Sequence, residues 1–320
     1  MSLLVVENLK VHFPVQTLPW AKTSKAIRAV DGVSFEVKSG ETVGLVGESG
    51  CGKTTLGRAI VGWVRPSAGR VLFDGQNPHD LRGRTLRLLR RDLQMIFQDP
   101  YGSLNPMMSI REIIREPLDI HHLGGSSNSR NVKVGELLEA VGLDPQLATR
   151  RPHEFSGGQR QRISIARALG VEPKLIVCDE PVSALDVSVQ AQIINLLADL
   201  QRSRGIAYLF IAHDLAVVEH LSQNILVMYL GKVVESGATR NVTAHPKHPY
   251  TQALISSVPS VDPNTRRTRI RLSEDIPTPL DPPSGCVFHT RCPLATDRCR
   301  IEAPTLRPTA SNHQVACHLV

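Results

Sequence analysis

The stretch Gly47-Glu48-Ser49-Gly50-Cys51-Gly52-Lys53-Thr54-Thr55 decides the fold of this chain. Before it, Thr42-Val43-Gly44-Leu45-Val46 predicts a short buried strand, and after it Leu56 to Trp63 predicts a helix. Between a strand and a helix, the pattern G-x-x-x-x-G-K-[ST] indicates a phosphate-binding loop, because its glycines let backbone N–H groups turn towards an anion at the positive end of a helix. The sequence therefore predicts a nucleotide site in an α/β domain.

The residue types within the loop assign individual roles. Lys53 is expected to reach the β- and γ-phosphates, Thr54 to hold Mg²⁺ through its hydroxyl, and Thr55 to add a phosphate contact. The candidate nucleotide-binding residues of the loop are Gly47, Glu48, Ser49, Gly50, Cys51, Gly52, Lys53, Thr54 and Thr55. The alternative, a plain glycine-rich turn, loses weight only if the other parts of a nucleotide site follow along the chain.

Composition excludes several classes of protein. With 320 residues and 41% hydrophobic residues, the chain can bury a sizeable core. No apolar run approaches the length of a membrane span, and the N-terminus lacks the features of a signal peptide, so we expect a cytoplasmic location. The net charge of +7 is spread along the chain, which favours a solvated basic surface over a nucleic-acid face, and 4% aromatic residues argues against a base-stacking platform.

Two apolar strands end in residues suited to hydrolysis. Leu175 to Cys178 leads into Asp179 and Glu180, and such an acidic pair is the expected partner of a phosphate loop. Asp179 would bind Mg²⁺ directly or through water, and Glu180 would deprotonate the attacking water. The next strand, Ala207 to Ala212, ends at His213, which we assign to a γ-phosphate contact instead of to a satisfied surface histidine.

Between the loop and the acidic pair, the sequence predicts a helical insertion over about residues 99–165. Gln98 follows the apolar strand Leu93 to Phe97. Residues 102–106 are expected to be a loop, and residues 124–129 a flexible link. Ser156-Gly157-Gly158-Gln159 opens a helix, with Ser156 as its N-cap and two glycines that expose backbone N–H groups. Near the N-terminus, Phe13 could equally stack on a base or belong to the core.

Taken together, these motifs closely resemble the nucleotide-binding subunit of ABC transporters. The resemblance rests on the phosphate loop, Gln98, the signature Ser156 to Gln159, the strand ending in Asp179 and Glu180, the stretch Ser183 to Asp186, and His213. It implies a P-loop NTPase (RecA-like) core with an antiparallel β subdomain and a helical signature subdomain. It also implies an ATP-bridged dimer, in which one chain's phosphate loop faces the other's signature.

The same resemblance assigns further roles. Phe13 matches the residue that stacks on adenine, and Gln98 would join the Mg²⁺ or water shell. The signature begins with Phe155 where leucine is commoner in the family, a departure that leaves its glycines intact.

The Pro-rich segment from His245 to Thr251 resembles the start of the C-terminal extension in the oligopeptide/dipeptide-uptake branch of this family. We therefore predict a nucleotide-binding domain at 1–243 and an extension at 244–320. The branch implies a peripheral subunit at the cytoplasmic face of the membrane. Its partners would be a second ATPase subunit (a heterodimer), two permease subunits and an extracytoplasmic peptide-binding protein, with no nucleic acid. Import of another solute (nickel, glutathione or glycosides) and a soluble non-transport ATPase are the alternatives.

Four of the six cysteines are concentrated near the C-terminus: Cys286, Cys292, Cys299 and Cys317. Thiolates are soft ligands for zinc or iron–sulfur clusters, and disulfides are not expected in a reducing compartment. The spacing matches neither a zinc knuckle nor a ferredoxin, so a cluster, zinc and free thiols stay open on the residues alone. The resemblance favours a [4Fe–4S] cluster with a structural role. Cys51 and Cys178, inside the ATPase motifs, are assigned to packing.

Overall fold

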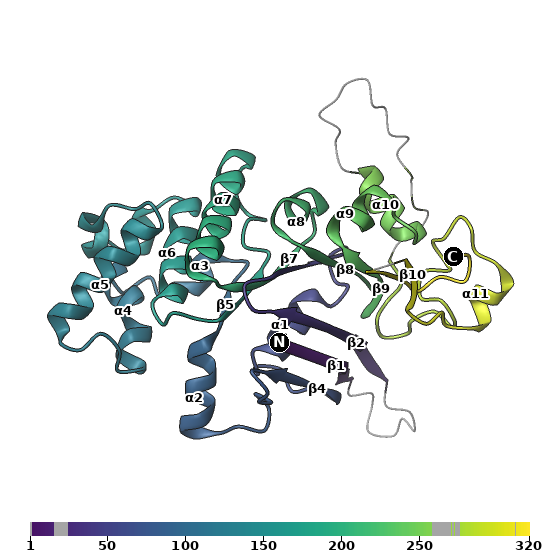
Figure 1. Ribbon diagram of the computed structural model, residues 1–320, viewed down its shortest axis with the longest axis horizontal. Helices are drawn as coiled ribbons and strands as arrows, with labels where there is room; N and C mark the ends of the chain where they lie inside the picture. The colour runs from purple at the N-terminus through teal and green to yellow at the C-terminus, as the bar shows by residue number, and fades with distance from the viewer. Residues whose placement is uncertain (1, 16–24, 258–269, 271, 273–275, 311) are drawn as a thin grey trace. The chain divides into compact units, whose positions relative to one another are not determined.

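A computed structural model describes residues 2–15, 25–257, 270, 272, 276–310 and 312–320 (Figure 1). The sequence also predicts a loop at residues 17–24, and this segment lies outside the described residues. Along the chain the elements are β1 (Ser2–Pro14), β2 (Ala26–Lys38), β3 (Thr42–Val46), α1 (Lys53–Ile60), β4 (Ala68–Phe73), α2 (Gly83–Asp92), β5 (Leu93–Ile96), α3 (Pro100–Ser103), α4 (Ile110–Ile120), α5 (Ser127–Ala140), η1 (Pro145–Thr149), η2 (Pro152–Glu154), α6 (Gly157–Leu169), β6 (Leu175–Asp179), α7 (Val187–Arg204), β7 (Ala207–Ala212), α8 (Leu215–Leu221), β8 (Asn224–Tyr229), β9 (Lys232–Ala238), α9 (Thr239–Ala244), α10 (Pro249–Ser257), α11 (Asp297–Ile301), β10 (Arg307–Ala310) and β11 (His313–Val315).

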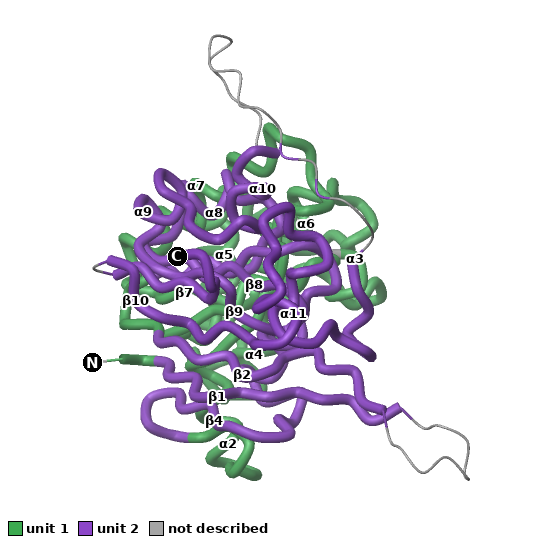
Figure 2. Tube along the Cα trace, turned by 90° about the vertical axis from the view of Figure 1, so that its right-hand side faces the viewer, with its two compact units in different colours: residues 1–3, 37–41, 77–209 green, residues 4–36, 42–76, 210–320 purple. Residues whose placement is uncertain are grey.

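The chain forms two compact units, coloured separately in Figure 2. Unit 1 consists of residues 1–3, 37–41 and 77–209, and unit 2 of residues 4–36, 42–76 and 210–320. The chain passes from one unit to the other more than once, so each unit is assembled from segments that are distant in sequence. The phosphate loop belongs to unit 2, and the strand that ends in Asp179 belongs to unit 1.

Unit 2 contains the strands that support the phosphate loop, in the order β10-β11-β9-β8-β3. Strand β3 runs parallel to β8, with Val43 beside Asn224 and Val46 beside Val227. All five residues of β3 are buried, as is typical of a parallel strand that is covered on both faces. A three-stranded sheet in the order β2-β1-β4 also lies in this unit, and its β1 and β4 pair antiparallel, as expected.

Unit 1 pairs β5 with β6 in parallel and carries helices α2 to α7. Two expected loops prove partly helical. Gly102 and Ser103 lie in α3, because the Asp99 side chain accepts a hydrogen bond from Tyr101 N at 2.8 Å and so caps this turn. Helix α5 begins at Ser127, inside the expected link at 124–129, because Ser126 caps it in the same way.

The C-terminal segment, by which we mean the described residues from 244 to 320, is part of unit 2 and packs against β8 and β9 through buried groups. Glu235 of β9 is fully buried, and its carboxylate accepts hydrogen bonds from the backbone nitrogens of Lys247 and His248 at 2.8 and 2.9 Å. The His313 ring lies 2.7 Å from the same carboxylate. Phe288 is also fully buried, with its ring centroid 5.2 Å from that of Tyr229. The segment therefore shares the core of unit 2.

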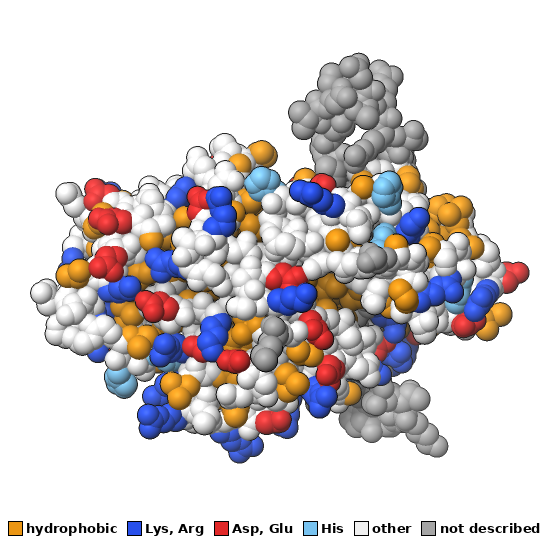
Figure 3. Space-filling model, viewed as in Figure 1, with side chains coloured by type: hydrophobic (Ala, Val, Ile, Leu, Met, Phe, Trp, Pro, Cys, Tyr) orange, Lys and Arg blue, Asp and Glu red, His pale blue; other side chains and the backbone are white. Residues whose placement is uncertain are grey.

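The helices and the surface add two observations. Among the described residues, no helix has both the length and the apolar character that crossing a bilayer demands. On the face seen in Figure 3, Lys and Arg side chains are interspersed with Asp and Glu and form no single continuous basic surface.

Candidate functional site: a phosphate loop and its partners

The backbone of the phosphate loop depends on glycine at two kinds of position. Gly50 and Gly52 have φ of +80° and +105°, which side chains rarely allow. A Cβ at Gly52 would lie 1.9 Å from the carbonyl oxygen of Ala29, and one at Gly47 would lie 2.2 Å from that of Met228. Glycine thus allows the left-handed turn of the loop and its close approach to the backbone of the neighbouring strands.

Lys53 lies at the centre of this loop, with a side chain only 4% exposed. Its Nζ donates hydrogen bonds to the carbonyl oxygens of Gly47 at 2.7 Å and Glu48 at 3.0 Å. Helix α1 begins at Lys53, and its N-cap residue, Gly52, provides no side-chain cap. A buried ammonium and the positive end of a helix therefore coincide, which is the electrostatic arrangement of an anion site.

Two residues that the sequence did not point to hold Glu48 in place. Tyr250 of α10 accepts a hydrogen bond from Glu48 N through its hydroxyl at 2.8 Å. Arg291 donates from Nη1 and Nη2 to the two carboxylate oxygens of Glu48, at 2.6 and 3.1 Å. The hydrogen bond to Glu48 raises the pKa of Arg291 above its usual range. No local sequence signal marks either contact, because the partners lie 202 and 243 residues away.

Other predicted residues of unit 2 differ in exposure. Phe13 is 40% exposed at the end of β1, so it is not a core residue and its ring is accessible for stacking. His213 is also exposed, at the end of β7. Cys51 is 3% exposed, and burial raises the pKa of its thiol, as befits a small residue that packs within the loop.

The acidic pair and Gln98 lie in unit 1. Asp179 is 2% exposed at the end of β6, whereas Glu180 is half-buried in the turn that follows. Gln98 Nε2 donates a hydrogen bond to Glu180 Oε2 at 3.1 Å, so the structure brings these two predicted residues together. Glu180 has a φ of +45°, a left-handed conformation that is uncommon outside glycine and that is often found at functional sites.

The signature is a capped helix start whose glycines have a second purpose. Gln159 N donates to Ser156 Oγ at 3.3 Å, and Ser156 N donates to Gln159 Oε1 at 3.0 Å, which together form a capping box. A Cβ on Gly158 would lie 2.4 Å from Val189 Cγ1, and one on Gly157 would lie 3.3 Å from Leu185 Cδ2. The close approach of α7 therefore requires at least Gly158, a packing constraint that the sequence did not reveal.

The structure does not confirm the metal centre expected at the four C-terminal cysteines. Among the described residues, no three His, Cys, Asp or Glu side chains are arranged to hold a metal ion. Cys286, Cys299 and Cys317 are buried and Cys292 is half-buried. Burial raises the pKa of Cys286 to about 11, and the nearby thiols of Cys299, Cys317 and Cys292 act in the same direction.

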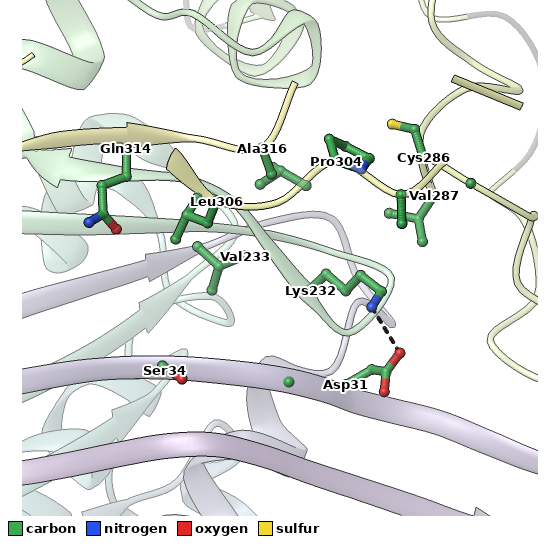
Figure 4. A pocket seen from close by; sticks show the side chains of 14 residues that line it. Asp31, Ser34, Lys232, Val233, Cys286, Val287, Pro304, Leu306, Gln314 and Ala316 are labelled. Carbon is green, nitrogen blue, oxygen red and sulfur yellow. Dashed lines mark ion pairs between the residues drawn. The ribbon is translucent and has the colours of Figure 1, made fainter. Parts of the chain in front are cut away.

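A cavity of about 380 Å³ lies between β2, β9 and the C-terminal segment (Figure 4). Two charged residues that line it form an ion pair, in which Lys232 Nζ lies 3.0 Å from the Asp31 carboxylate. Burial alone would raise the pKa of Asp31, but hydrogen bonds from Lys232 and His12 outweigh burial and lower it. Of the predicted site residues, only Cys286 lines this cavity, so it is separate from the phosphate loop.

Solved structures with a similar fold are ATP-binding cassettes. The cassette MJ0796, solved as a dimer in a post-hydrolysis state bound to ADP and Pi, is 29% identical with a TM-score of 0.65, over 74% of this chain and 99% of that chain. The protein cbiO1 from Clostridium perfringens, part of the ABC transporter complex cbiONQ, is 28% identical with a TM-score of 0.65, over 76% and 91% of the two chains. Fold and site together define a P-loop α/β ATP-binding cassette.

Family models match two regions of the chain. The ABC transporter model matches residues 30–183, and the model of the oligopeptide/dipeptide transporter C-terminal region matches residues 234–299. YkfD of Bacillus subtilis (strain 168) is 52% identical over 100% of this chain and 96% of its own. The oligopeptide transport ATP-binding protein AppF of the same organism is 50% identical over 99% and 97%. The chain belongs to the ABC transporter family and is an ABC-type ATPase, which confirms the resemblance.

Proposed function

We propose that this chain is the ATP-hydrolysing subunit that powers the import of di- or oligopeptides through a membrane ABC transporter complex. The observation that carries the proposal is a phosphate loop closed around the Lys53 ammonium. It lies in a chain that is 50% identical, over nearly its whole length, to an oligopeptide transport ATP-binding protein. The predicted domains, 1–243 and 244–320, assign hydrolysis to the first and leave the second as an extension.

In the proposed reaction, Lys53 and the N-terminus of α1 offset the negative charge of the β- and γ-phosphates. Glu180 accepts a proton from the attacking water, and the Gln98 amide orients its carboxylate through the 3.1 Å hydrogen bond. His213 contacts the γ-phosphate, and Phe13 stacks on the adenine. Thr54, Gln98 and Asp179 would supply oxygen donors that suit Mg²⁺, and the ion, when bound, would stabilise negative charge on the phosphates.

Replacing Glu180 with Gln tests this assignment. The change keeps the shape of the side chain but removes the base, so ATP binding should persist while turnover falls by about 100-fold or more. Replacing Lys53 with Ala should instead weaken nucleotide binding, because it removes the cation that faces the phosphates. ATP turnover by the assembled complex and equilibrium binding of MgATP separate the two effects. Wild-type turnover in the Glu180→Gln complex would remove that carboxylate from its role.

The proposed assembly places the signature residues Ser156, Gly157, Gly158 and Gln159 against the nucleotide of a second, homologous ATPase subunit. Two permease subunits and an extracytoplasmic peptide-binding protein would complete the complex, with this chain at the cytoplasmic face of the membrane. Ser156→Arg should block closure on ATP, because it puts a bulky cation where the γ-phosphate belongs. The affinity of the isolated subunit should change little. A large loss in that affinity would show that the signature acts within its own chain.

We also propose that Cys286, Cys292, Cys299 and Cys317 bind a [4Fe–4S] cluster, with zinc as the alternative. The support is chemical: four soft donors lie in one short segment, and, besides burial, the thiols of Cys299 and Cys317 help to raise the pKa of Cys286 and of Cys292. Their arrangement is not that of a metal site. Anaerobically purified protein should be brown and contain about four irons per chain. One zinc without iron would favour the alternative, and a colourless, metal-free, folded chain would overturn both.

Solute identity depends on proteins that this chain does not include. Nickel, glutathione and glycosides are alternative cargoes for the same ATPase role, and a soluble non-transport ATPase is a further alternative. Purification of the complex from its native operon, followed by identification of the bound solute, distinguishes all of these. A peptide in the binding protein is the expected result. A chain that purifies alone and hydrolyses ATP without membrane subunits would favour the soluble alternative.

A further inference from the structure

The C-terminal segment reaches the phosphate loop through a largely buried ion pair. Arg291, one residue before Cys292, is only 7% exposed, and the Glu48 side chain is 26% exposed. The two parallel hydrogen bonds between the Arg291 guanidinium and the Glu48 carboxylate fix the carboxylate in both position and angle. A loop residue that follows directly on Gly47 is therefore oriented by the far end of the chain.

Aromatic residues hold both members of this pair. The Arg291 guanidinium lies 5.8 Å from the ring centroid of Tyr229, and its Nη1 donates to the Tyr229 hydroxyl at 3.5 Å. The Tyr229 ring packs edge-on against Tyr250, with centroids 4.8 Å apart, and Tyr250 accepts the Glu48 N–H. Glu48 is thus held by its backbone and by its side chain, and both contacts come from the last quarter of the chain.

The charge of Glu48 gives this arrangement a consequence for binding. A carboxylate in a loop that receives phosphates repels them when it has no counter-ion. Arg291 supplies that counter-ion at close range. In addition, the Glu48 carbonyl oxygen accepts one of the hydrogen bonds that orient the Lys53 ammonium. A shift of Glu48 would therefore change both the charge of the loop and the placement of its lysine.

We propose that Arg291 is a positioning residue for the nucleotide: through Glu48 it neutralises and orients the phosphate loop, so that the C-terminal segment sets the affinity for ATP. The inference rests on the proposed nucleotide site at this loop. Arg291 does not touch the nucleotide, and its effect passes entirely through Glu48. The C-terminal segment, for which the sequence predicts an extension with a structural metal site, thereby contributes to the ATP site.

The test compares MgATP binding by full-length variants. Arg291→Ala should raise the Kd for MgATP by about tenfold, within the range of couplings between linked sites. Arg291→Lys, which keeps the charge but loses the two-pronged contact, should give a smaller rise. Arg298→Ala is the matched control: its ion pair with Glu302 lies in the same segment, is exposed and does not contact the loop, so its Kd should equal that of the wild type.

A double-mutant cycle separates positioning from a general loss of structure. In a Glu48→Gln background the repulsive charge is absent, so Arg291→Ala should raise the Kd by less than about twofold. Thermal unfolding of each variant checks folding, and Arg291→Gln replaces Arg291→Ala if the latter unfolds. An equal rise in both backgrounds, or an unchanged Kd in the single variant, would overturn the coupling. Failure of the wild type to bind, or unaltered binding by Lys53→Ala, would overturn the nucleotide site itself.

Discussion

The phosphate loop and the signature look alike in sequence, since each places glycines at the start of a helix, yet glycine serves a different purpose in each. In the phosphate loop, Gly50 and Gly52 adopt left-handed backbone angles that side chains resist. In the signature, Gly158 lies inside α6 and is required by the nearness of Val189 in α7. The phosphate loop needs glycine because of its backbone conformation, and the signature needs glycine because a neighbouring side chain lies too close for a Cβ.

The two regions also differ in how the N-terminus of the following helix is capped. Ser156 closes the start of α6 with its hydroxyl, whereas Gly52 leaves the start of α1 without a side-chain cap. An uncapped helix start next to a buried lysine is prepared for an external anion. A glycine-rich loop is therefore not a nucleotide site by composition alone, and the cap is the more informative feature.

The largest loss of stability is expected at Gly52, where a side chain would meet both an unfavourable backbone conformation and a steric clash. Gly52→Ala combines a φ of +105° with a Cβ 1.9 Å from a backbone oxygen, so it should lower the free energy of unfolding by about 3 kcal/mol or more. Urea denaturation of the full-length chain measures the loss. A Gly52→Ala protein as stable as the wild type would show that the loop can adopt another conformation.

In the signature, the expected penalty comes from a side chain and can be relieved. Gly158→Ala places a Cβ 2.4 Å from Val189 Cγ1 and should cost about 2 kcal/mol by overpacking. Val189→Ala in the same chain removes the clashing methyl groups, so the double variant should recover most of the loss. If the double variant stays as unstable as Gly158→Ala alone, contact with α7 is not the reason for this glycine.

The cap of α6 should contribute less. Ser156→Ala removes the oxygen that accepts the hydrogen bond from Gln159 N and should cost about 1 kcal/mol of stability. Ser156→Asp keeps an acceptor at this position and should retain most of that stability. Thermal unfolding of the two variants side by side checks the difference, and identical melting temperatures would argue that the cap contributes nothing.

The smallest effect is expected at Gly50. Its φ of +80° is also left-handed, but a Cβ at this position would have no atom within 4 Å. Gly50→Ala should therefore cost about 1 kcal/mol or less, because reduced freedom of the unfolded chain offsets part of the strain. Urea denaturation beside Gly52→Ala measures the difference. A loss as large as that of Gly52→Ala would mean that conformation alone, and not close approach, controls the loop.

The sequence predicts those elements best whose ends carry their own signals. The run from Val187 to Arg204 predicts a helix in the sequence alone, and helix α7 has these bounds. Asp186 caps its start, and Gly205, at a φ of +67°, ends it. The short buried strand predicted at Thr42–Val46 is also found, as β3, and all five of its residues are buried. The Gln98–Glu180 contact joins two residues that the family motifs mark independently.

What the sequence could not predict depends on partners far along the chain. Strand β11 pairs with β9, with His313 opposite Gly237, although no sequence pattern near His313 predicts a strand. The contacts of Arg291 and Tyr250 with Glu48 are of the same kind. The arrangement of the four C-terminal thiols, which is not that of a metal site, also could not be predicted, because cysteine spacing reports which ligands are present and not how the fold arranges them.

The left-handed backbone of Glu180 has a consequence for protein engineering. At a φ of +45°, glycine or asparagine has a lower conformational energy than glutamate. A search for heat-resistant variants should therefore enrich substitutions at this position. Such variants would fold well and express well, yet they would lack the base proposed for hydrolysis. A library of this protein that is ranked by stability alone would therefore select inactive molecules, and every round should be screened for ATP turnover as well.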